Sequence, residues 1–216
     1  MPDFTVPASA LAYCYADQLT SAVVGRTALD LDHQLPCRDA KAKRKDVVTL
    51  VFTAALVHLA RRGAIRMETG TRGALIKRKY VLVTLATRAL ATAGIEAALL
   101  AEVSGKAKDD GAGNLVARLL GKDRTDPWGH AVSLIQESLV ELGLFAESER
   151  RGLGKLMGKD RTPVCDRVLA LQAQVPVLKG LLSEFRAAQG PLYEQLWKDI
   201  GSGLASRQDK PDVDLD

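Results

Sequence analysis

The chain has 216 residues, of which 47% are hydrophobic and 26% charged, and its net charge is +4. This length and composition exclude an intrinsically disordered polypeptide and allow one good core, or two small cores that share an interface. Ala and Leu are abundant while aromatic residues make up only 5%, which favours helices, so we expect a mainly α fold.

Three cysteines, Cys14, Cys37 and Cys165, are spread widely along the chain. An odd number of cysteines cannot form a complete disulfide framework, so we expect a reducing compartment. The start of the chain lacks the basic segment and apolar run of a secretion signal. The longest apolar stretches, residues 47–60 and 80–100, are too short or are interrupted by charges. We therefore expect a cytoplasmic protein with no integral membrane segment.

The first predicted elements are a helix and a basic linker within residues 1–45. Residues 6–28 carry apolar side chains, Tyr15 among them, at roughly helical spacing. Residues 30–45 are polar and contain a proline, which is typical of a connection.

A second helix is predicted over residues 46–62, where apolar residues cover a broad face. Asp46 stands where a residue could cap the start of this helix. Arg61 and Arg62 suit the negative end of the helix dipole, and Gly63 would end the helix.

A β-hairpin is predicted directly after this helix. Residues 64–68 alternate between apolar and polar, residues 69–73 have the composition of a turn, and residues 79–83 would return. A helix, a glycine and a hairpin in this order are typical of a winged helix. With a further helix over residues 87–103, they predict a first winged-helix-like unit of residues 46–103.

The same pattern recurs later in the chain, where residues 139–145 correspond to residues 59–65. Both segments close a helix and precede a polar stretch rich in Gly and basic residues. Before the second segment, residues 104–113 are expected to form a loop and residues 114–120 a short helix. We predict a second winged-helix-like unit, residues 104–166, with its own small β-hairpin.

The pentapeptide Gly-Lys-Asp-Arg-Thr occurs twice, at residues 121–125 and 158–162. Because Asp and Thr side chains bond the local backbone in turns, both copies are predicted to be turns. Residues 167–206 are predicted to form C-terminal amphipathic helices with a break near Gly190. Residues 207–216 are predicted to be a disordered acidic tail.

Patterns of catalytic or metal-binding residues are absent from the sequence. The histidines, His33, His58 and His130, accompany no nucleophile signature such as Gly-x-Ser-x-Gly. His33 and Cys37 are a close pair of zinc-ligand type, but no second pair completes a tetrahedral site. The Gly-rich stretch 105–113 lacks the spacing of a phosphate-binding loop. We therefore expect no enzyme, with no catalytic residue, no bound metal and no cofactor.

Positive charge is concentrated between residues 38 and 79, which hold twelve Lys or Arg and three acidic residues. This excess is larger than the net charge of the whole chain, so the rest is net acidic. The asymmetry indicates a polyanionic partner, with a solvated face as the alternative. Basic residues before the helix and at the base of the hairpin would then converge on one side. The candidate anion-binding residues are Arg38, Lys41, Lys43, Arg44, Lys45, Lys77, Arg78 and Lys79.

Four segments resemble the Golgi phosphoprotein 3 family and its bacterial relatives, over about residues 47–184. They are LARRGAIRME (59–68), NLVARLLG (114–121), LVELGLF (139–145) and RTPVCD (161–166). The resemblance implies a helical fold that attaches peripherally to membranes by binding phosphoinositide and can self-associate through a projecting hairpin. The chain departs from the family at the headgroup pocket, so no lipid-site residue is carried over. Val132, Leu134 and Gln136 stand where basic side chains are expected, and Trp128 and Trp197 fall elsewhere.

The leading hypothesis is a non-enzymatic peripheral membrane-binding or adaptor protein, whose basic face recognises anionic headgroups, including those of phosphoinositides. One alternative is a winged-helix nucleic-acid-binding protein that inserts the helix of residues 46–62 into a groove. That helix is apolar over most of its length, which disfavours this alternative. A further alternative is a protein-protein scaffold, in which the hairpins mediate contacts in a homo-oligomer.

Overall fold

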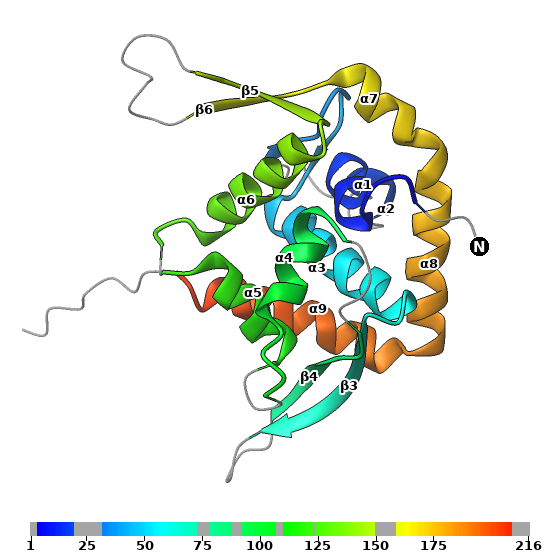
Figure 1. Ribbon diagram of the computed structural model, residues 1–216, viewed down its shortest axis with the longest axis vertical. Helices are drawn as coiled ribbons and strands as arrows, with labels where there is room; N and C mark the ends of the chain where they lie inside the picture. Colours follow the sequence, from blue (N-terminus) through cyan, green and yellow to red (C-terminus); the bar gives the residue numbers. More distant parts are fainter. Residues whose placement is uncertain are drawn as a thin grey trace, which may run out of the picture.

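The computed structural model describes residues 4–19, 32–72, 78–87, 92–106, 110–122, 124–149 and 159–208. Helices predominate among these residues, and the strands pair two by two in antiparallel fashion (Figure 1). The predicted mainly α fold is therefore confirmed. No helix of the described residues combines the length and the apolar composition needed to cross a bilayer.

Helix α3 (Arg44–Arg61) lies at the centre of the molecule (Figure 1). Every residue from 47 to 59 is buried, because apolar and small side chains surround the helix instead of forming one stripe. Helices from both halves of the chain pack around α3, which joins them in one core. They are α1 (Ala8–Cys14), α4 (Gly94–Glu102), α6 (Pro127–Glu141), α8 (Val175–Ala188) and α9 (Gly190–Ala205).

The start of α3 differs from the prediction. Lys43 occupies the cap position and makes no side-chain cap bond, while Asp46 lies within the first turn. The Asp32 carboxylate instead accepts a hydrogen bond from the Arg44 N–H at 2.6 Å. Asp32, twelve residues before Arg44, thus takes the place of a capping residue next to the helix. Capping rules consider only adjacent residues, so they do not predict it.

The predicted N-terminal helix is interrupted at Tyr15, where φ is −129° and ψ is 31°. A short helix, α2 (Ala16–Leu19), follows, and residues 20–31 lie outside the described part of the chain. The Tyr15 hydroxyl is buried and donates a hydrogen bond to the Val168 carbonyl at 2.8 Å. The helix thus breaks at a residue that bonds to a distant part of the chain, and the apolar spacing of residues 6–28 did not predict this break.

The helix–glycine–hairpin pattern is present twice. Strands β3 (Ile65–Arg72) and β4 (Arg78–Leu85) follow α3, and strands β5 (Phe145–Glu149) and β6 (Lys159–Pro163) follow α6. Gly63 and Gly143 have φ values of +72° and +69°, which are costly for residues with a Cβ. The next N–H bonds back to the helix at 2.9 Å in both cases, from Ala64 to Leu59 and from Leu144 to Leu139.

The two copies of the repeated pentapeptide differ in conformation. The first follows α5 (Ala112–Leu120) as a loop that begins at Gly121, with a φ of +72°. In the second copy, the described residues belong to strand β6, so the turn prediction is wrong there. Pairing with β5 overrides the local preference of the same residues.

The C-terminal region is helical as predicted. Helix α7 (Cys165–Ala170) continues through a 3-10 turn (Leu171–Gln174) into α8, and α8 turns into α9 at Gln189. The predicted break near Gly190 is therefore confirmed. The predicted disordered tail of residues 207–216 begins too early, because Arg207 is held by a hydrogen bond from its Nε to the Ala117 carbonyl at 2.9 Å. Residues 209–216 lie outside the described part of the chain.

The basic linker before α3 is structured by a small hairpin and a disulfide. Strands β1 (His33–Gln34) and β2 (Lys41–Ala42) pair, and Cys37 in the turn between them bonds to Cys165 at the start of α7. The expectation of a reducing compartment rested on the odd number and wide spacing of the cysteines, and it did not predict this disulfide between cysteines 128 residues apart. Cys14 is free and buried in α1.

Candidate anion-binding site

The predicted basic residues fall at two separate places. Five of them, residues 38–45, precede α3 or begin it, whereas Arg78 and Lys79 begin strand β4. Lys77 lies outside the described residues. Helix α3 has 18 residues and spans roughly 27 Å, and the β3–β4 hairpin extends from its far end (Figure 1). The structure therefore does not bring the two groups together on one side.

Acidic residues accompany the basic residues that precede α3. The Arg38 guanidinium bonds to the Asp17 carboxylate with Nη2–Oδ2 at 2.8 Å. The Arg44 guanidinium bonds to the Asp126 carboxylate with Nη1–Oδ2 at 3.0 Å. Lys41 and Lys45 are exposed, and Lys43 is partly exposed. Internal carboxylates thus offset part of the positive charge that the sequence places here.

Arg78 and Lys79 line an open groove of about 500 Å³ between β4, α5 and α9. Helix α9 adds Lys198 to this groove, and all three basic residues are exposed. The other lining residues are small or polar: Tyr80, Gly111, Gly113, Asn114, Gln195, Asp199, Ser202, Gly203 and Ser206.

Glycines allow the groove to form. A Cβ on Gly113 would overlap the Asp199 carbonyl, and a Cβ on Gly203 would overlap the Gly113 carbonyl. The backbones of α5 and α9 are therefore in direct contact. Gly111 lies under the Tyr80 ring, where a Cβ would be 3.2 Å from Cδ2. The floor of the groove is therefore formed by glycine backbone and the Tyr80 ring, and the charged side chains lie at its opening.

Two side chains of α9 hold β4 in place beside the groove. Asp199 accepts hydrogen bonds from the Val81 N–H at 2.5 Å and from Gln195 Nε2 at 2.7 Å. Gln195 Nε2 also donates to the Lys79 carbonyl at 3.0 Å. Burial raises the pKa of Asp199 above its ordinary value, although these hydrogen bonds oppose the shift. The acid in the groove therefore serves as an anchor for the strand.

A second hollow, of about 340 Å³, adjoins the groove at Asn114. It is lined by basic side chains from three places: Lys106 in the loop after α4, Arg118 in α5, and Arg207 after α9. Ser104 and Ala117 complete the lining. We call the two hollows together the α5 groove.

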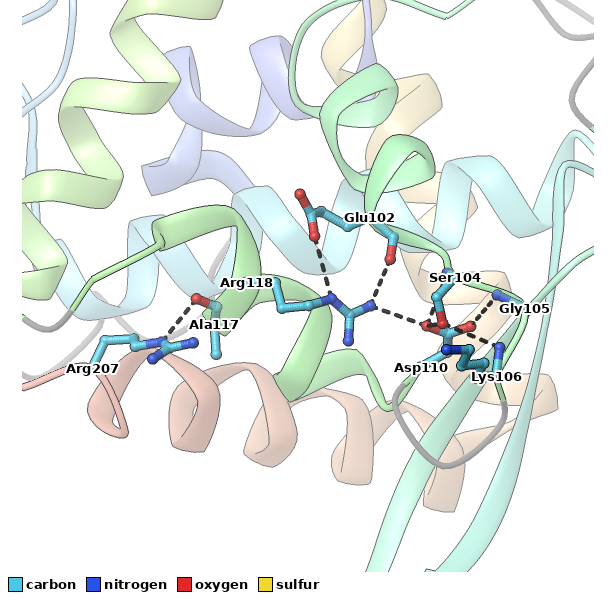
Figure 2. Close-up of polar contacts among 8 residues, drawn as sticks. All are labelled: Glu102, Ser104, Gly105, Lys106, Asp110, Ala117, Arg118 and Arg207. Carbon is cyan, nitrogen blue, oxygen red and sulfur yellow. Dashed lines mark hydrogen bonds and ion pairs between the residues drawn. The ribbon is translucent and has the colours of Figure 1, made fainter.

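A buried carboxylate organises the loop beside Arg118 (Figure 2). Asp110 is 1% exposed and accepts hydrogen bonds from Ser104 N–H at 3.0 Å, Gly105 N–H at 2.7 Å and Arg118 Nη2 at 3.0 Å. Burial alone would raise the pKa of Asp110, but these hydrogen bonds outweigh it and leave the pKa below its ordinary value. The loop and the guanidinium are thereby fixed to each other.

The position of Arg118 is set from both sides. Its Nε donates to Glu102 Oε2 at 3.2 Å and its Nη2 to the Glu102 carbonyl at 2.5 Å, opposite Asp110 (Figure 2). Nearby, Arg207 Nε donates to the Ala117 carbonyl at 2.9 Å, which fixes the end of α9 to α5. Preorganised guanidinium groups suit planar oxyanions such as phosphate or carboxylate.

The sequence predicted only part of this site. Arg78 and Lys79 were among the candidates, but Lys106, Arg118, Lys198 and Arg207 were not. Lys106 lies in the Gly-rich stretch that fails the pattern of a phosphate loop, and Lys198 lies in a helical region read only for its apolar face. Arg207 lies in the tail that was predicted to be disordered. Lys198 approaches β4, and Arg207 approaches α5, through the packing of α9, which no local pattern encodes.

Another polar cluster in the core has a structural explanation. Glu96 is 2% exposed and accepts hydrogen bonds from the Ser9 N–H at 3.0 Å and from the Ser9 hydroxyl. It thus caps α1 from α4, and His58 Nδ1 lies 3.6 Å from it. Cys37 is in a disulfide, so it is no thiolate ligand beside His33. Within the described residues, no three His, Cys, Asp or Glu side chains form a group that could hold a metal ion.

Comparisons of this chain with the sequence models of protein families, with curated proteins and with solved structures found no match.

Proposed function

We propose that this chain is a non-enzymatic peripheral membrane-binding or adaptor protein, which recognises anionic headgroups through the α5 groove. The observation that carries the proposal is the gathering of basic side chains from α5 and from the segments around it, namely β4, the loop after α4, α9 and the residues after α9. They are Arg78, Lys79, Lys106, Arg118, Lys198 and Arg207. Phosphoinositide is the ligand that the resemblance to the Golgi phosphoprotein 3 family implies, and the protein would act in the cytoplasm.

The exposed basic side chains of the groove support reversible recruitment. Each Lys or Arg near an anionic bilayer contributes about 1 kcal/mol, so several exposed side chains give attachment without an inserted anchor. Arg118 is paired with Glu102 and Asp110, so the charge available to a bilayer comes chiefly from the exposed side chains of the groove. These are Arg78, Lys79, Lys106 and Lys198. Asp199 also lines the groove, and its carboxylate accepts the Val81 N–H. The groove also lies beside the β3–β4 hairpin, which extends from the body of the molecule (Figure 1).

The repeated helix–glycine–hairpin pattern supports two winged-helix-like units, residues 46–103 and 104–166. The nucleic-acid alternative would need the first unit to insert residues 46–62 into a groove of DNA. In α3, residues 47–59 are all buried, so this helix has no face for base contacts. The membrane proposal is therefore the better supported of the two. A homo-oligomeric scaffold is compatible with it.

The test is co-flotation with liposomes of phosphatidylcholine that contain increasing phosphatidylserine or phosphoinositide, at physiological salt. The groove variant carries Arg78→Ala, Lys79→Ala and Lys198→Ala. The matched control carries Lys41→Ala, Lys43→Ala and Lys45→Ala, and thus loses the same charge from the linker. We expect flotation to require anionic lipid, to resist equimolar duplex DNA, and to be lost in the groove variant alone.

Other outcomes of this experiment would contradict parts of the proposal. Loss in the linker variant alone would move the site to the residues before α3. Equal weakening of both variants would indicate a general charge effect without a site. Absence of flotation at every lipid composition would overturn the membrane proposal.

A further inference from the structure

The Cys37–Cys165 disulfide joins two distant parts of the chain at the surface. Cys37 lies in the turn between β1 and β2, and Cys165 is the first residue of α7. Figure 1 shows the segment before α3 extending to the start of α7. Cys165 is exposed and Cys37 is partly exposed. A thiol in solution can therefore approach this disulfide without prior unfolding of the core.

The third cysteine provides an internal contrast. Cys14 is 0% exposed within α1, and burial raises the pKa of its thiol to about 12. Because the thiolate is the reactive form, this thiol is both inaccessible and unreactive near neutral pH. Thiol chemistry in the folded chain is thus restricted to the Cys37–Cys165 pair.

Few other bonds hold the turn that contains Cys37. The β1–β2 ladder consists of two residue pairs, which is too short for independent stability. Within the turn, the Leu35 N–H donates to the Ala40 carbonyl at 2.9 Å, and Gln34 Nε2 donates to the Arg38 carbonyl at 2.7 Å. Cys37 has a φ of +57°, which is uncommon for a residue with a side chain.

Attachment of this turn to its surroundings rests on few side chains. Arg38 bonds to Asp17 and lies over the Tyr15 ring, with its Cζ 5.0 Å from the ring centroid. Leu35 and Ala42 are buried. Pro36 is buried as well. The disulfide adds a covalent link between the turn and α7 to these contacts, so its opening weakens the attachment of residues 36–41.

We propose that Cys37 and Cys165 form a thiol–disulfide exchange site, and that a dithiol reductant opens it and loosens the basic turn of residues 36–41. A thiolate of the reductant attacks Cys165 Sγ, the S–S bond breaks, and Cys37 leaves as a thiolate that takes up a proton. The second thiol of the reductant then attacks the mixed disulfide and releases Cys165. The protein gains two electrons and two protons, and the dithiol becomes a disulfide.

This site is independent of the α5 groove, because its chemistry and its test do not involve the groove residues. Its consequence falls on the other basic group. Arg38 and Lys41 both lie within residues 36–41, so opening the disulfide makes the positions of these two charges less fixed while α3 and its core remain folded.

The first experiment treats the oxidised full chain with graded dithiothreitol, then with N-ethylmaleimide under native conditions, and locates the labels by peptide mass spectrometry. We expect labels on Cys37 and Cys165 while the far-ultraviolet circular dichroism is unchanged. Cys14 should be labelled only after denaturation. Absence of native labels at the pair, or labels that appear together with Cys14 and a loss of helicity, would overturn the proposal.

The second experiment follows trypsin cleavage. After reduction, cleavage after Arg38 and Lys41 should accelerate several-fold, while cleavage after Lys198 in α9 should keep its rate. The Cys37→Ser/Cys165→Ser variant should reproduce the reduced rates without reductant, and Cys14→Ser should respond as the wild type does. Identical cleavage after Arg38 and Lys41 in the oxidised, reduced and double-serine proteins would show that the disulfide does not control the turn.

Discussion

The two helix–hairpin units of this chain have the same local structure and different positions in the fold. Helices α3 and α6 both end at a glycine with positive φ, and both are followed by the same return hydrogen bond. Yet residues 47–59 of α3 are all buried, whereas α6 buries one face, including Ala131, Ile135 and Leu139. A local motif thus sets the path of the chain, while the side chains along each helix set its depth.

The two hairpins differ in the side chains that anchor them to the rest of the molecule. The first is joined to α9 by Asp199, which is half-buried and accepts the Val81 N–H. The second is joined to its own helix by Arg161, which bonds to Glu137 at 2.7 Å and lies 3.4 Å from Glu147. The first hairpin therefore depends on contacts distant in sequence and contributes to the α5 groove, whereas the second depends on neighbours within its unit.

The largest predicted difference concerns equivalent positions within the two helices. Phe52 in α3 is 0% exposed, and its counterpart in α6, Val132, is partly buried. We expect Phe52→Ala to lower the free energy of unfolding by about 3–5 kcal/mol, because it leaves a cavity in the core. Val132→Ala should lower it by roughly 1 kcal/mol, because fewer methyl groups lose their burial. Urea denaturation measures both values, and equal losses would contradict the assigned difference in depth.

A smaller difference is predicted for the anchors of the hairpins. Asp199→Ala leaves the Val81 N–H without this acceptor, so we expect a loss of about 1–3 kcal/mol in the free energy of unfolding. Arg161→Ala removes ion pairs to partly exposed carboxylates, so we expect roughly 0–1 kcal/mol. Hydrogen exchange of the Val81 amide should accelerate only in the first variant. A larger loss for Arg161→Ala would reverse the comparison.

The pH dependence of Asp199→Asn separates its charge from its hydrogen bonds. Burial raises the pKa of Asp199 above 3.8, so the folded state binds this proton more tightly than the unfolded state does. The contribution of Asp199 is then greatest in acid and decreases as the pH rises through the folded-state pKa. The free energy of unfolding of the wild type, minus that of Asp199→Asn, should therefore decrease over that rise in pH, and an increase would contradict the raised pKa.

Local patterns predicted the elements that depend on neighbours in sequence. The helix of residues 46–62, the two glycine ends and the break near Gly190 follow from periodicity and from the conformational freedom of glycine. Features set by distant contacts were missed. The Asp32 cap of α3, the break at Tyr15 and the Cys37–Cys165 disulfide each depend on a partner brought close by folding.

The candidate site shows the same division. Arg78 and Lys79 were found because basic residues cluster in sequence around the hairpin. Lys198 and Arg207 join them because Gly113 in α5 and Gly203 in α9 let the two helices approach closely. Nothing in the sequence indicates that these two glycines are partners. Residues 38–45 lie before α3 and at its start, whereas the packing of β4 on α5 and α9 positions Arg78 and Lys79, so different elements hold the two groups.

The smallest predicted difference concerns the glycines themselves. A Cβ at Gly63 would meet no atom within 4 Å, so Gly63→Ala should cost only the strain of a positive φ, about 1–2 kcal/mol. At Gly143, a Cβ would lie 2.6 Å from Arg167 Nη1, which donates to the Gly143 carbonyl at 2.9 Å. Gly143→Ala should therefore lower the free energy of unfolding by about 0.5–1.5 kcal/mol more than Gly63→Ala does, which is the contribution of one hydrogen bond.

A double-mutant cycle tests whether Arg167 accounts for this difference. In an Arg167→Ala background the obstacle and the hydrogen bond are both gone, so Gly143→Ala should cost the same as Gly63→Ala. If the larger cost persists without Arg167, the two helix ends differ in their backbones, and their equivalence would be wrong. If the costs become equal, the repeated motif is one structure at both sites, and a single side chain from α7 distinguishes its second copy.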